Sequence, residues 1–167
     1  MSCNSCIFFR SLVVFIEPNE RGIILTPYQQ AGYQHDVLKP GWHLIKLGER
    51  LQIYNISRQV YTMSSPDSIE AKTLDGKTIF VDISIIYALD PEKILDMHIN
   101  WQDRYKDSLV RPLSRSIIRE TISLYNLNEI GAQLSEVEQA IFNKLSMQFT
   151  ENYLILLKFS IITFKSS

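Results

Sequence analysis

The sequence predicts an α+β domain in which an antiparallel sheet is followed by two or three helices and a closing strand. Three observations lead to this expectation. Apolar residues alternate with other residues from Ile79 to Leu89, which is typical of a half-buried antiparallel strand. Helical periodicity replaces this alternation after Asp90, and alternation returns from Tyr153 to Phe164. A run of strands followed by a run of helices favours α+β over a doubly wound sheet.

The N-terminal half has the composition of strands separated by turn residues. The segments Leu12–Glu17 and Gly22–Thr26 flank a Pro-Asn-Glu-Arg turn, and we expect them to pair as a hairpin. The segment Leu51–Met63 is long and β-rich, and its apolar positions change parity after Ile53, which predicts a β-bulge. Asp75-Gly76 is a hairpin-turn signature directly ahead of the alternating strand.

Helix signals dominate the second half. Asp90-Pro91-Glu92 predicts a helix start, because Asp can cap and Pro fits the first turn. A longer helix is expected over Gln102–Tyr125, with Pro112 as a kink or a join. The segment Asn126-Leu-Asn128 is expected to end it. Ser135-Glu-Val-Glu138 then has the spacing of a capping box at the start of a third helix.

Composition excludes several functional classes. The 167 residues correspond to about one domain, and 17 Lys+Arg against 18 Asp+Glu give a net charge of -1. This balance argues against nucleic acid as a partner. The two cysteines, Cys3 and Cys6, cannot provide a disulfide framework. Their C-x-x-C spacing would suit a redox pair or half a zinc site, but no second Cys/His pair accompanies it. A disordered tail, or cysteines available for acylation beside a membrane, is the favoured interpretation.

An apolar run extends from Cys6 to Ile16 and is interrupted by Arg10. It is too short to span a bilayer and lacks the features of a signal peptide. Its side chains suit a monotopic membrane contact, and Arg10 can reach the headgroups. The candidate membrane-contact residues are Ile7, Phe8, Phe9 and Leu12. The alternative is that residues 1–11 are a tail and that the domain, residues 12–165, begins with Leu12–Ile16 as its first core strand.

No catalytic constellation is visible in the sequence. Nucleophile-elbow, Gly-rich phosphate-loop and HExxH motifs are all missing. His35, His43 and His98 are scattered at spacings that do not suit a metal site. The sequon at Asn55-Ile-Ser57 lies in a predicted strand and is discounted. We therefore expect a protein that is not an enzyme and binds no cofactor or metal.

Arg111, Arg115 and Arg119 form a stripe at i, i+4 and i+8 on the long predicted helix. One interpretation is a basic face for anionic lipid or an acidic partner. The favoured alternative is a solvated helix face that Asp103, Asp107 and Glu120 balance locally.

Four segments have a recurring combination of motifs. They are Val13–Ile24, with Pro-x-Glu-x-Gly; Leu38–His43, with Leu-x-Pro-Gly-x-His; Lys72–Pro91, with Thr-x-Asp-Gly and Tyr-x-Leu-Asp-Pro; and Val110–Glu120, with Val-x-Pro-x-x-Arg-x-x-Ile-Arg-Glu. In their order and separations they resemble the prohibitin-like members of the stomatin–prohibitin–flotillin (SPFH, band 7) family. No single motif is specific, whereas the four together indicate the family.

The resemblance implies two abutting α/β subdomains on a membrane and a non-enzymatic scaffold that organises membrane proteins or lipids. It also implies homo- or hetero-oligomers with related subunits through a coiled coil, and a possible role in regulating a membrane protease. A soluble protein–protein interaction module of the same fold is the alternative. The chain departs from the family pattern near Gln133-Leu134, where a basic residue is missing, and it stops at Ser167. We therefore expect a truncated fragment or a short member with weak assembly.

Overall fold

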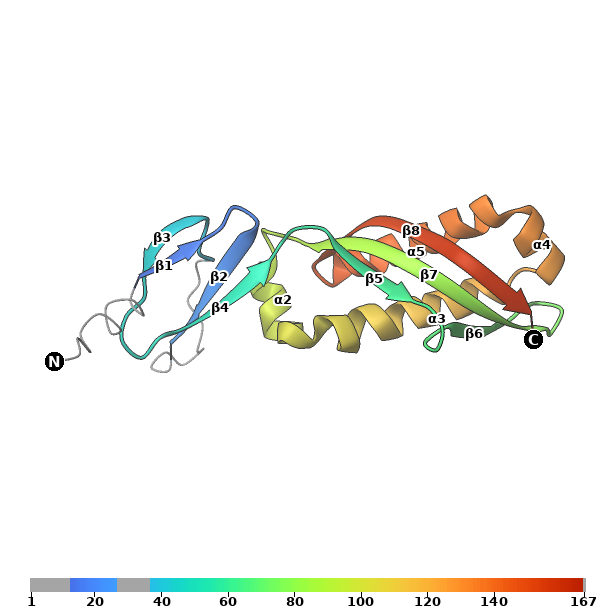
Figure 1. Ribbon diagram of the computed structural model, residues 1–167, viewed down its shortest axis with the longest axis horizontal. Coiled ribbons are helices and arrows are strands. Elements are labelled where there is room, and N and C mark those ends of the chain that lie inside the picture. The colour runs from blue at the N-terminus through green and yellow to red at the C-terminus, as the bar shows by residue number, and fades with distance from the viewer. Residues whose placement is uncertain (1–12, 27–36, 167) are drawn as a thin grey trace. The chain divides into compact units, whose positions relative to one another are not determined.

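The computed structural model describes residues 13–26 and 37–166 (Figure 1). The chain forms two compact units. Unit 1 comprises Met1–Ser57 and Leu89–Asp96, and unit 2 comprises Arg58–Ala88 and Met97–Ser167. Each unit is treated separately below.

Unit 1 contains two antiparallel ribbons. Strand β1 (Val13–Ile16) pairs with β3 (Gly41–Leu44), and β2 (Glu20–Leu25) pairs with β4 (Arg50–Asn55). The expected hairpin between the first two strands is therefore wrong. The Pro-Asn-Glu-Arg segment does reverse the chain, but turn residues do not specify which strand lies alongside. That choice depends on packing between segments that are distant in the sequence.

Gly22 shows how tightly these ribbons pack. Its N–H donates to the Leu38 carbonyl at 3.1 Å, and the Leu38 N–H donates back at 2.8 Å. An added Cβ at this position would lie 2.6 Å from Ile16 Cδ1 and 2.9 Å from Leu51 Cδ1. Gly22 is therefore required for the close approach of the strands around it.

The predicted bulge in the segment Leu51–Met63 is also wrong. The segment is divided into two strands, β4 and β5 (Gln59–Met63), which belong to different sheets. The change of parity after Ile53 marks the passage from unit 1 to unit 2 rather than an extra residue in one strand. A bulge and a strand break produce the same local pattern, so the sequence could not distinguish them.

Unit 2 is built on a four-stranded antiparallel sheet around β7 (Thr78–Leu89). Strand β5 pairs with the C-terminal half of β7, β6 (Ile69–Lys72) pairs with its beginning, and β8 (Leu154–Ser166) also pairs with β7. The predicted alternation in β7 and the closing strand are confirmed. The expected turn is also present, since Lys72 lies opposite Thr78 and Gly76 has a φ of +77°.

Helices follow β7. Helix α2 (Ile94–Trp101) is succeeded by a short 3₁₀ turn, η1 (Gln102–Arg104), and a π-helical turn, η2 (Lys106–Val110). Helix α3 (Arg111–Ile122) then begins with Pro112 in its first turn. Pro112 therefore marks a join between helical segments, which is one of the two predicted outcomes, because proline lacks the N–H that a helix interior needs.

The capping box lies at a different place from the predicted one. The side chain of Asn126 caps helix α4 (Leu127–Ala132), and Glu129 Oε2 accepts the Asn126 N–H at 2.8 Å. Helix α5 (Leu134–Glu151) begins after Gln133 without a side-chain cap. The predicted break at Asn126 is confirmed, since α3 ends at Ile122 and α4 begins at Leu127, whereas the prediction of Ser135 as a cap is wrong. Glu138, the supposed partner of Ser135, binds the backbone of β8 instead.

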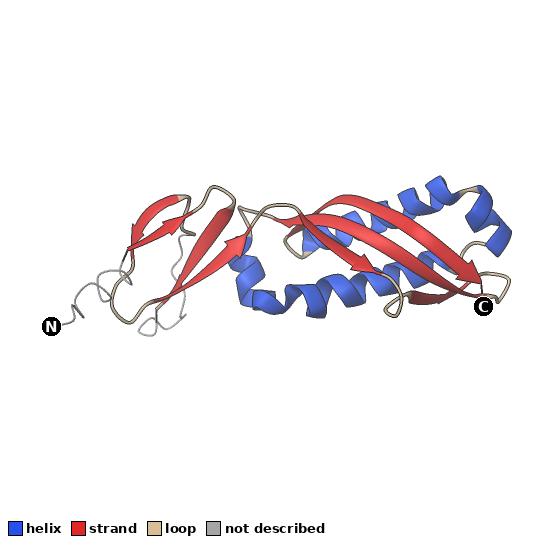
Figure 2. Ribbon diagram, viewed as in Figure 1, coloured by secondary structure: helices blue, strands red, loops and turns tan. Residues whose placement is uncertain are grey.

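Two layers make up unit 2 (Figure 2). Helices α3 and α5 cover one face of the sheet, and they contact β6 and β8 respectively. The odd-numbered side chains of β7 are buried between the layers. The helices contribute Ile117, Ile118, Ile122, Val137, Ile141, Leu145 and Phe149 to this core. The predicted α+β class is confirmed.

Candidate membrane-contact surface

The β1–β3 ribbon exposes four large apolar side chains on one face. Antiparallel pairing places Val13 opposite Leu44 and Phe15 opposite Trp42. Residues that lie directly opposite or two positions apart share one face of a ribbon. All four are exposed, Trp42 at 74% and Leu44 at 71%. We call this set of four side chains the ribbon patch.

The ribbon patch has an ordered centre. The rings of Phe15 and Trp42 lie with centroids 5.1 Å apart and planes tilted by 53°. On the opposite face of the ribbon, Ile16 is fully buried in unit 1. The buried face fixes the register, and the register in turn brings the four exposed side chains together.

The segment after β3 adds apolar and basic character. Leu47 is 78% exposed, and Lys46 is exposed beside it. Glu49 is tied to the turn, because its Oε2 accepts the Lys46 backbone N–H at 2.9 Å. Contiguous exposed apolar side chains with polar neighbours are typical of interaction or membrane-contact sites.

The sequence analysis did not identify the ribbon patch. A four-residue strand such as β3 gives too short an alternation to reveal which face is buried, and the pairing with β1 is a long-range property. The residues predicted for membrane contact and lipidation lie outside the part of the chain that the structure describes. They are Ile7, Phe8, Phe9 and Leu12 for contact, and Cys3 and Cys6 for lipidation.

The three arginines of the stripe form ion pairs and hydrogen bonds with the sheet side of unit 2. Arg111 and Arg115 both bind the carboxylate of Asp67, which raises the pKa of the Arg111 guanidinium through a direct hydrogen bond. Arg115 also donates to the Asp67 carbonyl at 2.9 Å, and Arg119 Nε donates to the Glu70 carbonyl at 2.8 Å. The binding partners are therefore residues of the β5–β6 connection and β6, not neighbours along the helix. A role for the stripe in lipid binding stays a prediction.

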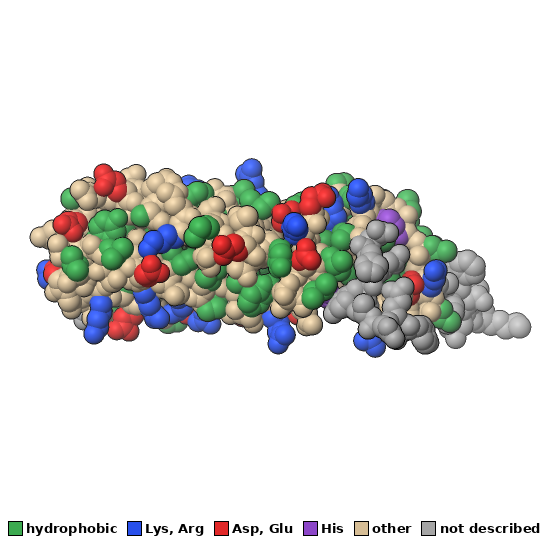
Figure 3. Space-filling model, turned by 180° about the vertical axis from the view of Figure 1, so that it is seen from behind, with side chains coloured by type: hydrophobic (Ala, Val, Ile, Leu, Met, Phe, Trp, Pro, Cys, Tyr) green, Lys and Arg blue, Asp and Glu red, His purple; other side chains and the backbone are tan. Residues whose placement is uncertain are grey.

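Glu120, one of the neighbours expected to balance the stripe, pairs with Lys144 of α5 at 2.8 Å. Figure 3 views the molecule from behind, and on the face of unit 2 seen there acidic and basic side chains are interspersed. Mixed charge of this kind gives little long-range attraction toward an anionic surface.

Two buried tyrosines, Tyr87 and Tyr105, share the side chain of Gln59 as their hydrogen-bond acceptor. Tyr105 donates to Gln59 Oε1 at 2.9 Å, and Tyr87 does so at 3.4 Å. Burial raises the pKa of both hydroxyls, so both stay protonated at neutral pH. The Tyr87 ring also meets Phe149 edge to face. This cluster packs α5 and η2 against the sheet and offers no general base.

The two described histidines, His43 and His98, lie in different elements, and His35 lies outside the described residues. His43 lies in the ribbon, with Nε2 2.7 Å from the Lys39 carbonyl oxygen. His98 is buried in α2, where burial lowers its pKa. Within residues 13–26 and 37–166, no group of three or more metal-binding side chains is assembled. None of the described helices is long and apolar enough to cross a bilayer.

The chain is an α+β protein of two compact units, and the β1–β3 ribbon of unit 1 exposes large apolar side chains. The profile of the SPFH domain / Band 7 family matches residues 14–163, and the chain belongs to this family. A comparison with curated proteins gives no match.

Proposed function

We propose that the chain is a non-enzymatic, membrane-associated scaffold that attaches to one leaflet through the ribbon patch. The exposure of Trp42 and Leu44 on one ordered face is the observation that carries this proposal. Burying apolar surface at a lipid interface gains about 25 cal/mol per Å². Tryptophan favours the interfacial region, because its ring is apolar and its N–H can still reach a polar partner.

The N-terminal segment would extend this contact. Ile7, Phe8, Phe9 and Leu12 supply further apolar side chains, and acylation of Cys3 or Cys6 would add a second anchor. Two signals are generally needed for stable attachment. The proposed localisation is therefore peripheral or monotopic at a membrane.

Family membership extends the proposal to partners. We expect the scaffold to organise lipids or membrane proteins, to join related subunits through a coiled coil where the full-length protein has one, and to restrain or assist a membrane protease. Isolated residues 1–167 should be monomeric or weakly self-associating, since no coiled-coil seam is visible in the sequence. Light scattering at micromolar concentration tests this, and a stable high-order ring would contradict it.

The alternative is a soluble protein-interaction module of the same fold. Sedimentation with anionic liposomes separates the two functions. The double variant Trp42→Ser/Leu44→Ser should lose most of its binding, whereas Val60→Ser should bind as the unchanged chain does. Val60 is a matched control, because it is 66% exposed on the sheet of unit 2.

A second comparison separates the ribbon patch from the N-terminal segment. The chain without residues 1–11 should bind liposomes more weakly than the intact chain but more strongly than the double variant. Equal binding by the intact chain and the double variant would remove the ribbon patch as the anchor. If no form binds, even with the cysteines acylated, the soluble module becomes the better description.

A further inference from the structure

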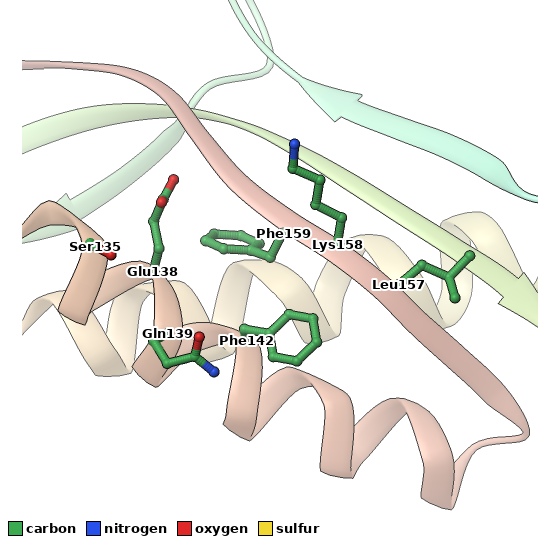
Figure 4. Close-up of a pocket in the computed structure, with 7 residues that line it drawn as sticks. All are labelled: Ser135, Glu138, Gln139, Phe142, Leu157, Lys158 and Phe159. Carbon is green, nitrogen blue, oxygen red and sulfur yellow. The ribbon is translucent and has the colours of Figure 1, made fainter.

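A groove runs between α5 and β8 in unit 2 (Figure 4). Its hollow measures about 200 Å³. Six of its lining residues matter here: Glu138, Gln139 and Phe142 from α5, and Leu157, Lys158 and Phe159 from β8. Figure 4 shows the Phe159 ring extending from the strand to lie beside Glu138 of α5. The groove therefore has a helix as one wall and an edge strand as the other.

The second edge of β8 has no strand partner among the described residues. Within that part of the chain, β8 pairs only with β7. The Ile161 N–H does not point toward β7, because it donates to Glu138 Oε1 at 2.6 Å. Backbone groups in a strand alternate between its two edges, so Phe159 and Thr163 direct theirs to the same side as Ile161. Three alternate residues thus present their backbone groups to an added strand, and among them the Ile161 N–H is bound by Glu138.

Glu138 occupies the place of a missing strand. Its carboxylate oxygen accepts the outward N–H of Ile161, as the carbonyl oxygen of a neighbouring strand would. An incoming carbonyl can replace it at little cost, since one hydrogen bond is exchanged for another. The displaced carboxylate would favour a basic over an acidic side chain on the incoming strand, although Lys158 of β8 lines the same groove and offers a second cation.

We propose that the α5–β8 groove binds an extended peptide segment of another protein by strand addition. The backbone edge dictates an extended occupant, and the displaced Glu138 favours a basic side chain on it. Leu157, which is 41% exposed, and Ile162, which is 56% exposed, offer apolar contacts to other side chains of the added strand. This inference does not depend on the membrane contact proposed above.

The test uses the intact chain and two short capped peptides of alternating threonine and valine. One peptide carries a central arginine, and the other carries a glutamate at the same position. Fluorescence polarisation should show saturable binding of the arginine peptide and a preference of about tenfold over the glutamate peptide, as one charged pair allows. Amide exchange measured by NMR should show new protection at Phe159 and Thr163 when the arginine peptide binds, whereas Ile161 is already hydrogen-bonded to Glu138 in the free chain.

Two variants test whether Glu138 causes the preference for the arginine peptide. In Glu138→Ala the two peptides should bind with similar affinity, because the charge that distinguishes them is gone. Glu136→Ala, an exposed acidic position on α5 outside the groove, should keep the full preference. If Glu138→Ala fails to fold, Glu138→Gln removes the charge, retains a hydrogen-bonding oxygen and should give the same result.

Three outcomes would overturn the proposal. They are the absence of saturable binding by the arginine peptide, binding without new protection of Phe159 and Thr163, and binding with equal preference in the intact chain and Glu138→Ala. Protection of these amides that increases with protein concentration in the absence of peptide would show instead that a second copy fills the edge.

Discussion

The β1–β3 ribbon of unit 1 and the four-stranded sheet of unit 2 both carry apolar side chains in alternation, but they use them in opposite ways. In β7 the apolar positions Ile79, Val81, Ile83 and Ile85 are buried beneath helices. In the ribbon the apolar face is the exposed one, and only Ile16 on its other face is fully buried. The same alternation therefore encodes a core in one region and a surface in the other.

The outer face of the unit 2 sheet makes the contrast sharper. Val60 and Phe80 are exposed there, but Thr62, Asp82 and Ser84 lie on the same face and dilute the apolar surface. Asp82 in addition accepts a hydrogen bond from Ser68. The ribbon patch has no such polar residue at its paired positions. The more continuous apolar surface of the ribbon favours it over the sheet as the proposed membrane contact.

The largest expected effect comes from a charge in the core of unit 2. Ile79→Asp or Ile83→Asp should prevent folding, because a buried carboxylate costs several kcal/mol against a total stability of about 5–15 kcal/mol. Ser84→Asp on the opposite face and Leu44→Asp in the ribbon patch should each change stability by about 0.5 kcal/mol or less. Urea unfolding measures all four. Wild-type stability for the core variants would mean that the buried face is wrongly assigned.

Gly22→Ala should destabilise unit 1 by about 1–3 kcal/mol, because the added methyl group overpacks the site. Its Cβ would collide with the buried Ile16 and would lie 3.3 Å from Leu38 Cβ. Chemical denaturation followed by tryptophan fluorescence is a suitable measurement. A neutral result would show that Ile16 and Leu51 can move aside, and that unit 1 is packed more loosely than unit 2.

Gly76→Val tests a glycine that is required for a different reason. A Cβ at this position meets no atom within 4 Å, so crowding cannot explain a loss of stability. The φ of +77° is the cause, and a β-branched residue there should cost about 1–2 kcal/mol. Gly76→Asn should recover much of this loss, because asparagine tolerates positive φ, whereas Gly22→Asn should fold poorly. Equal effects of asparagine at both glycines would contradict the distinction.

The smallest expected effect is a pH dependence of the folding stability that arises from Asp75 in unit 2. Asp75 accepts hydrogen bonds from Thr73 at 2.6 Å and from the Leu127 N–H at 3.3 Å. The Thr73 bond is the main reason that the pKa of Asp75 falls from 3.8 to about 2. A carboxylate with a lowered folded pKa stabilises the fold above its unfolded pKa, and this contribution is lost as the pH falls from 3.8 toward about 2.

Asp75→Asn removes this titration. The urea midpoint of the variant should therefore decline less than that of the unchanged chain over the same acidic range. Identical pH profiles for the two proteins would show that Asp75 does not link the β6–β7 turn to the start of α4 in solution.

Several features could be predicted from the sequence because short-range chemistry decides them. The alternation of β7, the Asp75-Gly76 turn, the join at Pro112 and the closing strand all follow from residues that lie close together in the chain. The order of the family motifs was equally visible, and the family match confirms it. The α+β class follows from the order of these elements.

Where two local signals compete, sequence alone fails. Asn126 and Ser135 both precede a glutamate by three residues, yet only Asn126 forms a capping box. Glu138 is held by the backbone of β8, a partner 23 positions away in the sequence. A carboxylate accepts hydrogen bonds from the donors that lie near it, and the tertiary structure decides which donors those are.

The sequence by itself determined the class, the family and the strand at the centre of unit 2. Only the tertiary structure decided that β1 pairs with β3, that the ribbon patch faces outward, and that Arg111 and Arg115 bind Asp67. Each of these depends on segments that are far apart along the chain. Their pairing is selected by the packing of the whole unit, because no single segment contains enough interactions to choose its own partner.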